Sequence, residues 1–158
     1  MSTLNLVKKL SKAMKIFRLR RARKSDWEDI NKLIPQLSAS AGILSFRDFK
    51  KILGNNSTYF FVYRRETRIV GMGLVVFVLT PVGLRAKIED VVVDLEFRGQ
   101  GFGSLLMRRL IVEAKKRKAL WVEFTSRKDR VLANNFYKKL GFRPRNVNIY
   151  RLSFRHGL

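Results

Sequence analysis

The residues best suited to chemistry in this chain form a glycine-rich stretch, Arg98-Gly99-Gln100-Gly101-Phe102-Gly103. Glycine allows positive φ angles and lets a ligand approach the main chain closely. Apolar residues recur at helical spacing directly after the stretch, at Leu105, Leu106, Leu110 and Ile111. The glycines would therefore precede a helix N-terminus, where unpaired N–H groups and the positive end of the helix dipole favour an anion. Arg98 adds a positive charge, so the stretch predicts a binding site for a diphosphate.

Two familiar phosphate-binding loops fit the stretch poorly. A P-loop ends in Gly-Lys-Ser/Thr, whereas Gly103 is followed directly by Ser104. The dinucleotide-binding fingerprint requires glycine at position 104, although Glu123 does lie about 20 residues downstream, where that fold places a ribose-binding acid. Residues 94–97 also separate the predicted strand from the glycines, which is loose for such a turn. The pattern that remains is Arg-x-x-Gly-x-Gly.

A second stretch further along the chain points to one family. Residues 133–142 read Ala-Asn-Asn-Phe-Tyr-Lys-Lys-Leu-Gly-Phe. The glycine stretch resembles motif A of the Gcn5-related N-acetyltransferases (GNAT), and the second stretch resembles their motif B, commonly written Ala-x-x-Phe/Leu-Tyr-x-x-x-Gly-Phe. The two motifs occur in the family's order, with a helix and a strand expected between them. The resemblance extends from about Met14 to Phe154.

The resemblance implies acetyl-CoA as cosubstrate and no metal. The pyrophosphate of acetyl-CoA would contact the main chain and side chains of Arg98, Gly99, Gln100, Gly101, Phe102, Gly103 and Ser104. In the family, the strand before this loop splays from the following parallel strand and the pantetheine arm enters the gap. Main-chain groups of Val91 and Val93 would then pair with its amides. Asn134 is a further expected contact, although Arg130 stands where many relatives carry an asparagine.

Acyl transfer to an amine requires bound CoA, a polarised carbonyl, a neutral amine and protonation of the leaving thiolate. The resemblance places Tyr137 near the sulfur, where a phenol could donate that proton; the alternative is a tyrosine packed in the core. Glu89 is the favoured base, acting through water, with Asp90 as the alternative. Because successive strand residues point to opposite faces, at most one of the two would face the cleft. Either carboxylate could instead pair with an arginine.

Composition excludes several other kinds of site. The 158 residues fit one domain and are 46% apolar, which is a globular value. There is no cysteine, and His156 is the single histidine. Disulfides, thiolate metal sites and a cysteine nucleophile are therefore excluded, and a Ser-His-Asp relay is disfavoured. Direct attack of an amine on a bound thioester needs none of these groups. No apolar run reaches the ~18 residues of a membrane span and no signal peptide is evident, so we expect a cytoplasmic protein.

The chain is very basic, with 34 Lys and Arg against 12 Asp and Glu and a net charge of +22. Such a charge is expected to attract polyanions, including RNA and CoA. The alternative is that the charged side chains only keep the surface solvated. A rival hypothesis is a nucleic-acid- or ribosome-associated protein that uses a GNAT-like fold for binding.

The amine acceptor, small molecule or protein, is left open, although polyamines are disfavoured. Residues 88–93 also resemble a strand of glucosamine-6-phosphate acetyltransferases, and a phosphorylated acceptor would suit a basic pocket. The oligomeric state is open, a dimer included.

The elements that must position these residues suggest a mixed α/β (α+β) GNAT fold. We expect a mostly antiparallel sheet with a splayed parallel pair, flanked by about four helices. The expected strands cover residues 16–21, 58–64, 68–79, 84–94, 119–125 and 146–154. Helices would start at capping boxes beginning at Ser25, Ser45 and Ser126, and directly after the glycine stretch; Pro35 would kink or split the first. Residues 14–158 would form a single domain behind a basic extension, residues 1–13.

Overall fold

The computed structural model describes residues 14–154, so the predicted extension over residues 1–13 and His156 lie outside the described part. The described chain forms two compact units, one ending at Phe124 and one beginning at Thr125. The assignment of residues 14–158 to a single domain stays a prediction.

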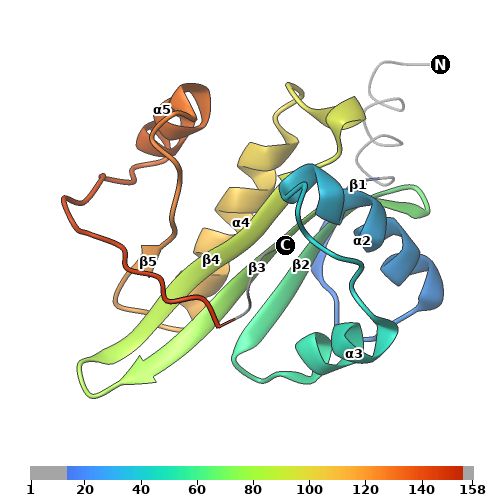
Figure 1. The fold of residues 1–158 in the computed structure, drawn as a ribbon, viewed down its shortest axis with the longest axis horizontal. Coiled ribbons are helices and arrows are strands. Elements are labelled where there is room, and N and C mark those ends of the chain that lie inside the picture. The colour runs from blue at the N-terminus through green and yellow to red at the C-terminus, as the bar shows by residue number, and fades with distance from the viewer. Residues whose placement is uncertain (1–13, 155–158) are drawn as a thin grey trace. The chain divides into compact units, whose positions relative to one another are not determined.

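The first unit contains a five-stranded sheet. Its elements are β1 (Met14–Arg18), α2 (Lys24–Leu37), α3 (Phe46–Gly54), β2 (Thr58–Arg65), β3 (Arg68–Thr80), β4 (Gly83–Val93), the 3₁₀ turn η1 (Leu95–Phe97), α4 (Phe102–Lys116) and β5 (Val122–Glu123). The strands lie in the order β1-β2-β3-β4-β5 (Figure 1). The first four pair antiparallel, and β4 and β5 pair parallel. The predicted mixed sheet with one parallel pair is confirmed.

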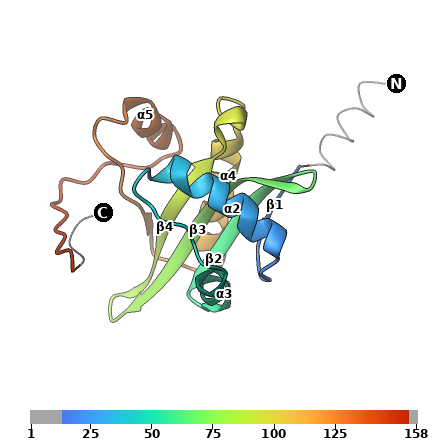
Figure 2. The same ribbon diagram turned by 45° about the vertical axis from the view of Figure 1, so that its right-hand side comes forward.

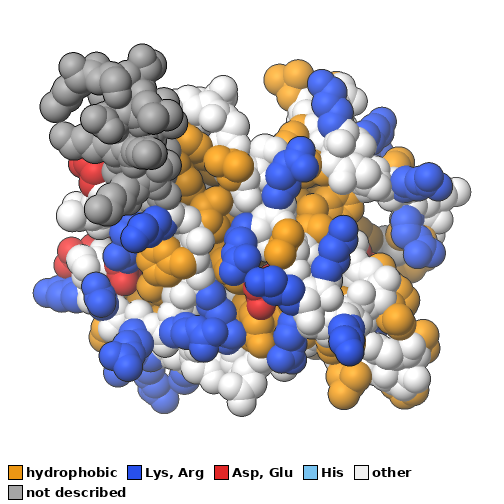
Figure 3. Space-filling model, turned by 180° about the vertical axis from the view of Figure 1, so that it is seen from behind, with side chains coloured by type: hydrophobic (Ala, Val, Ile, Leu, Met, Phe, Trp, Pro, Cys, Tyr) orange, Lys and Arg blue, Asp and Glu red, His pale blue; other side chains and the backbone are white. Residues whose placement is uncertain are grey.

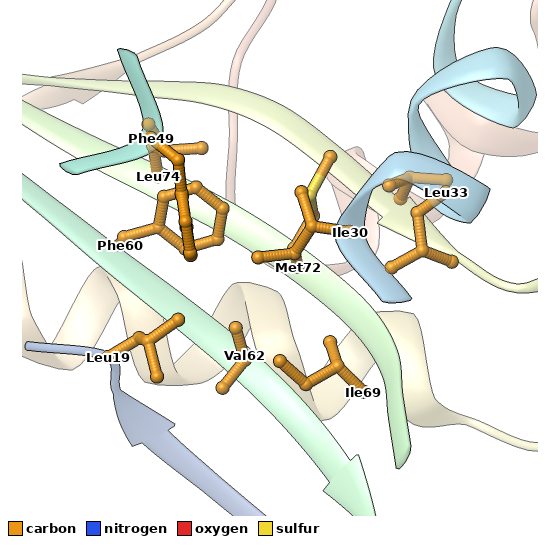
Figure 4. Close-up of a cluster of buried hydrophobic side chains, with 10 residues drawn as sticks. Leu19, Ile30, Leu33, Phe49, Phe60, Val62, Ile69, Met72 and Leu74 are labelled. Atoms are coloured by element: carbon orange, nitrogen blue, oxygen red, sulfur yellow. The ribbon is translucent and has the colours of Figure 1, made fainter. Parts of the chain in front are cut away.

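Helices cover both faces of this sheet: α2 and α3 lie on one face and α4 on the other (Figures 1 and 2). On the first face, side chains of both helices meet those of β2 and β3 (Figure 4). Ile30, Leu33 and Phe49 have no exposed surface in this cluster. Burying such side chains contributes about 1.5–3 kcal/mol each, which holds the helices to the sheet.

The second face carries α4 through its buried residues Leu106, Met107, Leu110 and Ala114. Gly73 of β3 permits this close packing, because a Cβ there would lie 3.0 Å from Leu110 Cδ1. The Phe102 ring, at the first position of α4, stacks on Tyr63 of β2 with ring centroids 4.8 Å apart. This aromatic contact fixes where the helix begins relative to the sheet.

Two details of the first helices differ from the sequence expectations. Helix α2 begins at Lys24 without a side-chain cap, so the capping box at Ser25 is wrong. Asp26 is buried instead and accepts a hydrogen bond from Arg64 of β2, a partner that local sequence does not reveal. Pro35 does not split the helix, which ends two residues later. The cap at Ser45 is confirmed: the Asp48 N–H donates to Ser45 Oγ at 3.0 Å.

The second unit contains one helix among its described residues, α5 (Val131–Lys139). The predicted capping box over residues 126–129 is wrong, because no side chain caps α5 and Arg127 instead forms an ion pair with Asp129 at 2.9 Å. Gly141 follows the helix with a φ of 94°, as expected of a glycine that closes a helix.

The strand predicted over residues 146–154 is also wrong. Its apolar side chains alternate but stay exposed, from 61% at Val147 to 90% at Phe154. A strand requires a hydrogen-bonded partner, and the described part of this unit contains no other strand. The strand expected over residues 119–125 is also shorter than predicted. Only Val122 and Glu123 form β5, and they are the two residues that pair with β4.

Basic side chains outnumber acidic ones on the face of the molecule that Figure 3 shows. Figure 3 shows Lys and Arg spread over one face of the molecule, with few Asp or Glu among them. This agrees with the net charge of +22. No helix in the described residues is long and apolar enough to span a membrane. Binding of a polyanion to this surface stays a prediction.

Candidate active site

The glycine stretch joins β4 to α4 through a tight loop. Gly99 and Gly101 have φ angles of 76° and 84°, a region in which other residues are strained. A Cβ at either position would find no atom within 4 Å, so the space above both glycines is open. Arg98 is tied to the end of β4, because its Nε donates to the Val93 carbonyl at 2.9 Å. The conformation and the open space are those that a main-chain anion site requires.

The N-terminus of α4 faces this loop without a side-chain cap, and Gly101 is its N-cap residue. Leu105 is the first residue whose N–H bonds back, to the Gly101 carbonyl at 3.1 Å. The N–H groups of Phe102, Gly103 and Ser104 have no partner within the helix and suit an anion. The Phe102 side chain is buried, so this residue offers only its main chain. The Gln100 side chain is also engaged locally, donating to the Glu96 carbonyl at 3.3 Å.

The β4 strand has an open edge next to this loop. Pairing with β5 is limited to Ala86 with Val122 and Lys87 with Glu123, whereas β4 continues to Val93. Among residues 14–124, no strand therefore pairs with this edge beyond Lys87. The Asp94 N–H bonds to Val70 of β3. Since main-chain groups alternate in direction along a regular strand, those of Val93 point to the open edge. Pairing of the cosubstrate with Val91 stays a prediction.

A β-bulge interrupts β4 at the candidate bases. Leu74 of β3 pairs with Glu89 and Met72 pairs with Val92, so Gly73 lies opposite both Asp90 and Val91. Asp90 adopts a φ of 52° as the extra residue. The expectation that Glu89 and Asp90 point to opposite faces assumed regular alternation, and the bulge resets that alternation. Strand alternation therefore selects neither carboxylate as the base.

The two carboxylates differ in their surroundings. Glu89 pairs in register with Leu74, which belongs to the core under α2 and α3, so Glu89 lies on that face. Its carboxylate lies 3.9 Å from Lys87 Nζ, and both side chains are 46% exposed. Partial desolvation raises the pKa of the Asp90 carboxyl above its ordinary value. Glu89 thus lies beside a cation, whereas Asp90 holds its proton more tightly than a fully solvated aspartate does.

The motif B residues belong to the second unit. Asn134 uses its side-chain amide to hold the preceding turn, donating to the Arg127 carbonyl at 2.9 Å. Tyr137 lies three residues later on the same side of α5. Its ring is partly buried and lies 5.4 Å from Phe136, centroid to centroid. The parts that Tyr137 and Asn134 play in catalysis and CoA binding stay predictions.

The sequence analysis missed a cavity beside the candidate bases. It has a volume of about 250 Å³ and is lined by Val78, Arg85, Lys87 and Glu123. Arg85 and Lys87 alternate with Glu89 along β4, and Glu123 pairs with Lys87, so all four charged residues share one face. That alternation was visible in the sequence, but the register with β5 was not. Among residues 14–154, no cluster of three His, Cys, Asp or Glu could hold a metal ion.

Comparisons with known proteins agree with this geometry. The family model described as "Acetyltransferase (GNAT) family" matches residues 18–142. An uncharacterised N-acetyltransferase of Methanocaldococcus jannaschii is 40% identical over 62 residues, which make up 39% of this chain and 27% of the relative. This chain thus matches only about a quarter of that relative's length.

Two solved structures match nearly their whole length. The crystal structure of a transcriptional regulator from Bacillus halodurans C-125 is 29% identical, with a TM-score of 0.77 over 89% of this chain and 99% of that one. The crystal structure of an acetyltransferase from Trypanosoma brucei is 26% identical, with a TM-score of 0.74 over the same shares. The chain therefore belongs to the acetyltransferase (GNAT) family, a family of acyl-CoA-dependent N-acyltransferases.

Proposed function

We propose that this protein transfers an acetyl group from acetyl-CoA directly to a primary amine. The observation that carries the proposal is the junction of β4 and α4. An uncapped helix N-terminus, two glycines with positive φ and the tethered Arg98 lie next to an open strand edge. A diphosphate suits the first group of features, and an extended arm with amide groups suits the second.

The cosubstrate would bind mainly through the main chain. The pyrophosphate would accept hydrogen bonds from the N–H groups at the start of α4, with the Arg98 guanidinium beside it. The pantetheine arm would run along β4 and pair with Val91 and Val93. The Val93 carbonyl already accepts from Arg98, which leaves the Val93 N–H for the arm. Asn134 would add a contact through its carbonyl oxygen, because its amide nitrogen donates within its own turn.

The chemistry needs only two side chains. The amine nitrogen attacks the thioester carbonyl, a C–N bond forms and the C–S bond breaks. Glu89 accepts the proton of the amine through water, and Asp90 is the alternative base. Tyr137 gives a proton to the leaving thiolate and regains one from solvent. No covalent acyl-enzyme is required, which agrees with the absence of cysteine from the sequence.

A thermal melt with added ligand tests the proposal. Acetyl-CoA at 100 times its dissociation constant should stabilise the protein by about 2.7 kcal/mol. For a chain of this size, that corresponds to a rise in Tm of about 5–11 °C. ATP at the same concentration and ionic strength is the control, because it carries phosphates without a pantetheine arm. The proposal is contradicted if acetyl-CoA gives no shift, or if ATP stabilises the protein equally.

A further inference from the structure

The cavity beside β4 is basic, and the proposed acetyl transfer uses none of the residues that line it. Arg85 and Lys87 supply two cations, and Glu123 supplies one carboxylate. Lys87 is already near an acid, since its Nζ lies 3.9 Å from Glu89. Arg85 differs, because no ion pair involves it among the described residues.

The Arg85 side chain carries an unsatisfied donor. Its Nε has less than 1 Å² of exposed surface and makes no hydrogen bond. Its guanidinium lies 5.9 Å from the centroid of the Trp121 ring, so an aromatic contact holds it rather than an acid. A buried N–H without a partner is costly. Because Nε itself is too buried for a ligand to reach, an anion in the cavity would pair with the terminal groups of the guanidinium, which share its charge. The cavity thus presents a positioned cation that lacks a counterion.

The cavity lies where the far end of an acceptor with its amine at Glu89 would reach. A ligand that extends from the glycine loop along the open edge of β4 passes Val93 and Val91 and then reaches Glu89. Lys87 and Arg85 come next on the same face, and pairing with β5 closes the edge there, at Lys87 and Glu123. Alternate strand residues are about 6.8 Å apart. An amine at Glu89 would therefore lie roughly 7–10 Å from an anion held between Lys87 and Arg85.

We propose that this cavity binds an anionic group of the acceptor. The substrate would be a primary amine that carries a carboxylate or phosphate several bonds from its nitrogen. This inference rests on the proposed acetyl transfer, and it narrows the acceptor from any amine to an anionic one. Glu89 would favour the amine end of the same molecule, whereas the anion would have to be held by Arg85 and Lys87 against the single carboxylate of the cavity, Glu123.

A matched series of amines tests the inference. Free-thiol release from acetyl-CoA is measured with 4-aminobutanoate, 6-aminohexanoate and 3-aminopropyl phosphate. Butylamine and hexylamine, which lack an anionic group, are the controls. We expect kcat/KM to be at least about tenfold higher for the anionic amines, as a charged hydrogen bond supplies. The carboxylate and phosphate members decide which anion the site prefers. Equal or better use of butylamine and hexylamine would overturn the inference.

Variants separate this site from the general charge of the protein. Arg85→Met should lower kcat/KM by about 10- to 100-fold for the amines that carry an anionic group. It should leave kcat/KM for butylamine and hexylamine unchanged. Arg20→Met is the control, because it removes the same charge from an exposed position. A loss that is equal for both kinds of amine, or equal in both variants, would contradict a specific anion site.

A binding measurement covers the case in which none of these amines reacts. Inorganic phosphate and acetate are titrated into protein saturated with acetyl-CoA, and NMR follows the indole N–H resonance of Trp121, whose ring centroid lies 5.9 Å from the Arg85 guanidinium. The inference predicts a saturable shift that is lost in Arg85→Met, and no shift would overturn it. Because acetyl-CoA binding is measured separately by the thermal melt, failure of the proposed transfer and failure of this anion site are distinguishable.

Discussion

Substituting Gly101 tests the glycine loop most sharply, because the expected effects on folding and on binding differ. Gly101 has a φ of 84° and open space where a Cβ would stand. In Gly101→Ala, the left-handed conformation costs about 1–2 kcal/mol of folding free energy. The Tm should fall by about 2–8 °C, and the fold should persist. The added methyl group would occupy the space through which a phosphate reaches the main chain.

The expected loss of affinity is larger than this strain. If the methyl group prevents one or two charged hydrogen bonds, each of about 1.5–3 kcal/mol, acetyl-CoA should bind about 100-fold more weakly. Titration calorimetry measures the affinity at a temperature well below both melting points. Gly141→Ala is the matched control, with a φ of 94° and equally open space. It should show a similar loss of stability with unchanged binding. If Gly101→Ala binds acetyl-CoA as tightly as the parent, the diphosphate site lies elsewhere.

Three further predictions concern single properties of the protein. Tyr137→Phe should lower kcat about 10²–10⁴-fold with little change in KM for acetyl-CoA, since the phenol acts only as the thiolate leaves; an unchanged single-turnover rate would make Tyr137 a packing residue. The raised pKa of Asp90 means that the folded state keeps this proton to higher pH than the unfolded chain, so stability falls as pH rises through that interval. Asp90→Asn, which tolerates the positive φ, should therefore raise the Tm at pH 7 but not near pH 3; an equal gain at both pH values would refute the charge argument. RNA retention should weaken linearly in log affinity against log salt concentration, and a salt-independent affinity would exclude attraction by the net charge of +22.

Local chemistry made most of the fold predictable. The aromatic run of β2, the β-branched runs of β3 and β4 and the helical spacing of apolar residues in α4 each specify one element. The positive φ angles of Gly99 and Gly101 follow from the residue type that the loop requires. The family membership predicted from two motifs is confirmed by the family model that matches residues 18–142. The motifs could be recognised in the sequence because each contains glycine where the backbone requires it.

The features that could not be predicted depend on partners distant in the chain. Asp26 looks like part of a capping box until Arg64, 38 residues away, is placed beside it. The bulge at Asp90 arises from the register between β3 and β4, which no local pattern specifies. Residues 146–154 alternate as a strand does, but alternation alone supplies no hydrogen-bonded neighbour. The cavity at Arg85 needs the pairing of Lys87 with Glu123.

Acetyl transfer is tested most directly by following both products of the reaction. The protein is incubated with acetyl-CoA and a panel of primary amines, free CoA thiol is quantified, and acetylated amine is identified by mass spectrometry. We expect one equivalent of acetylated amine for each thiol released, with the rate abolished in Gly101→Val. Thiol release without an acetylated amine would show hydrolysis instead of transfer. Release that is equally fast in Gly101→Val would contradict binding of acetyl-CoA at the glycine loop.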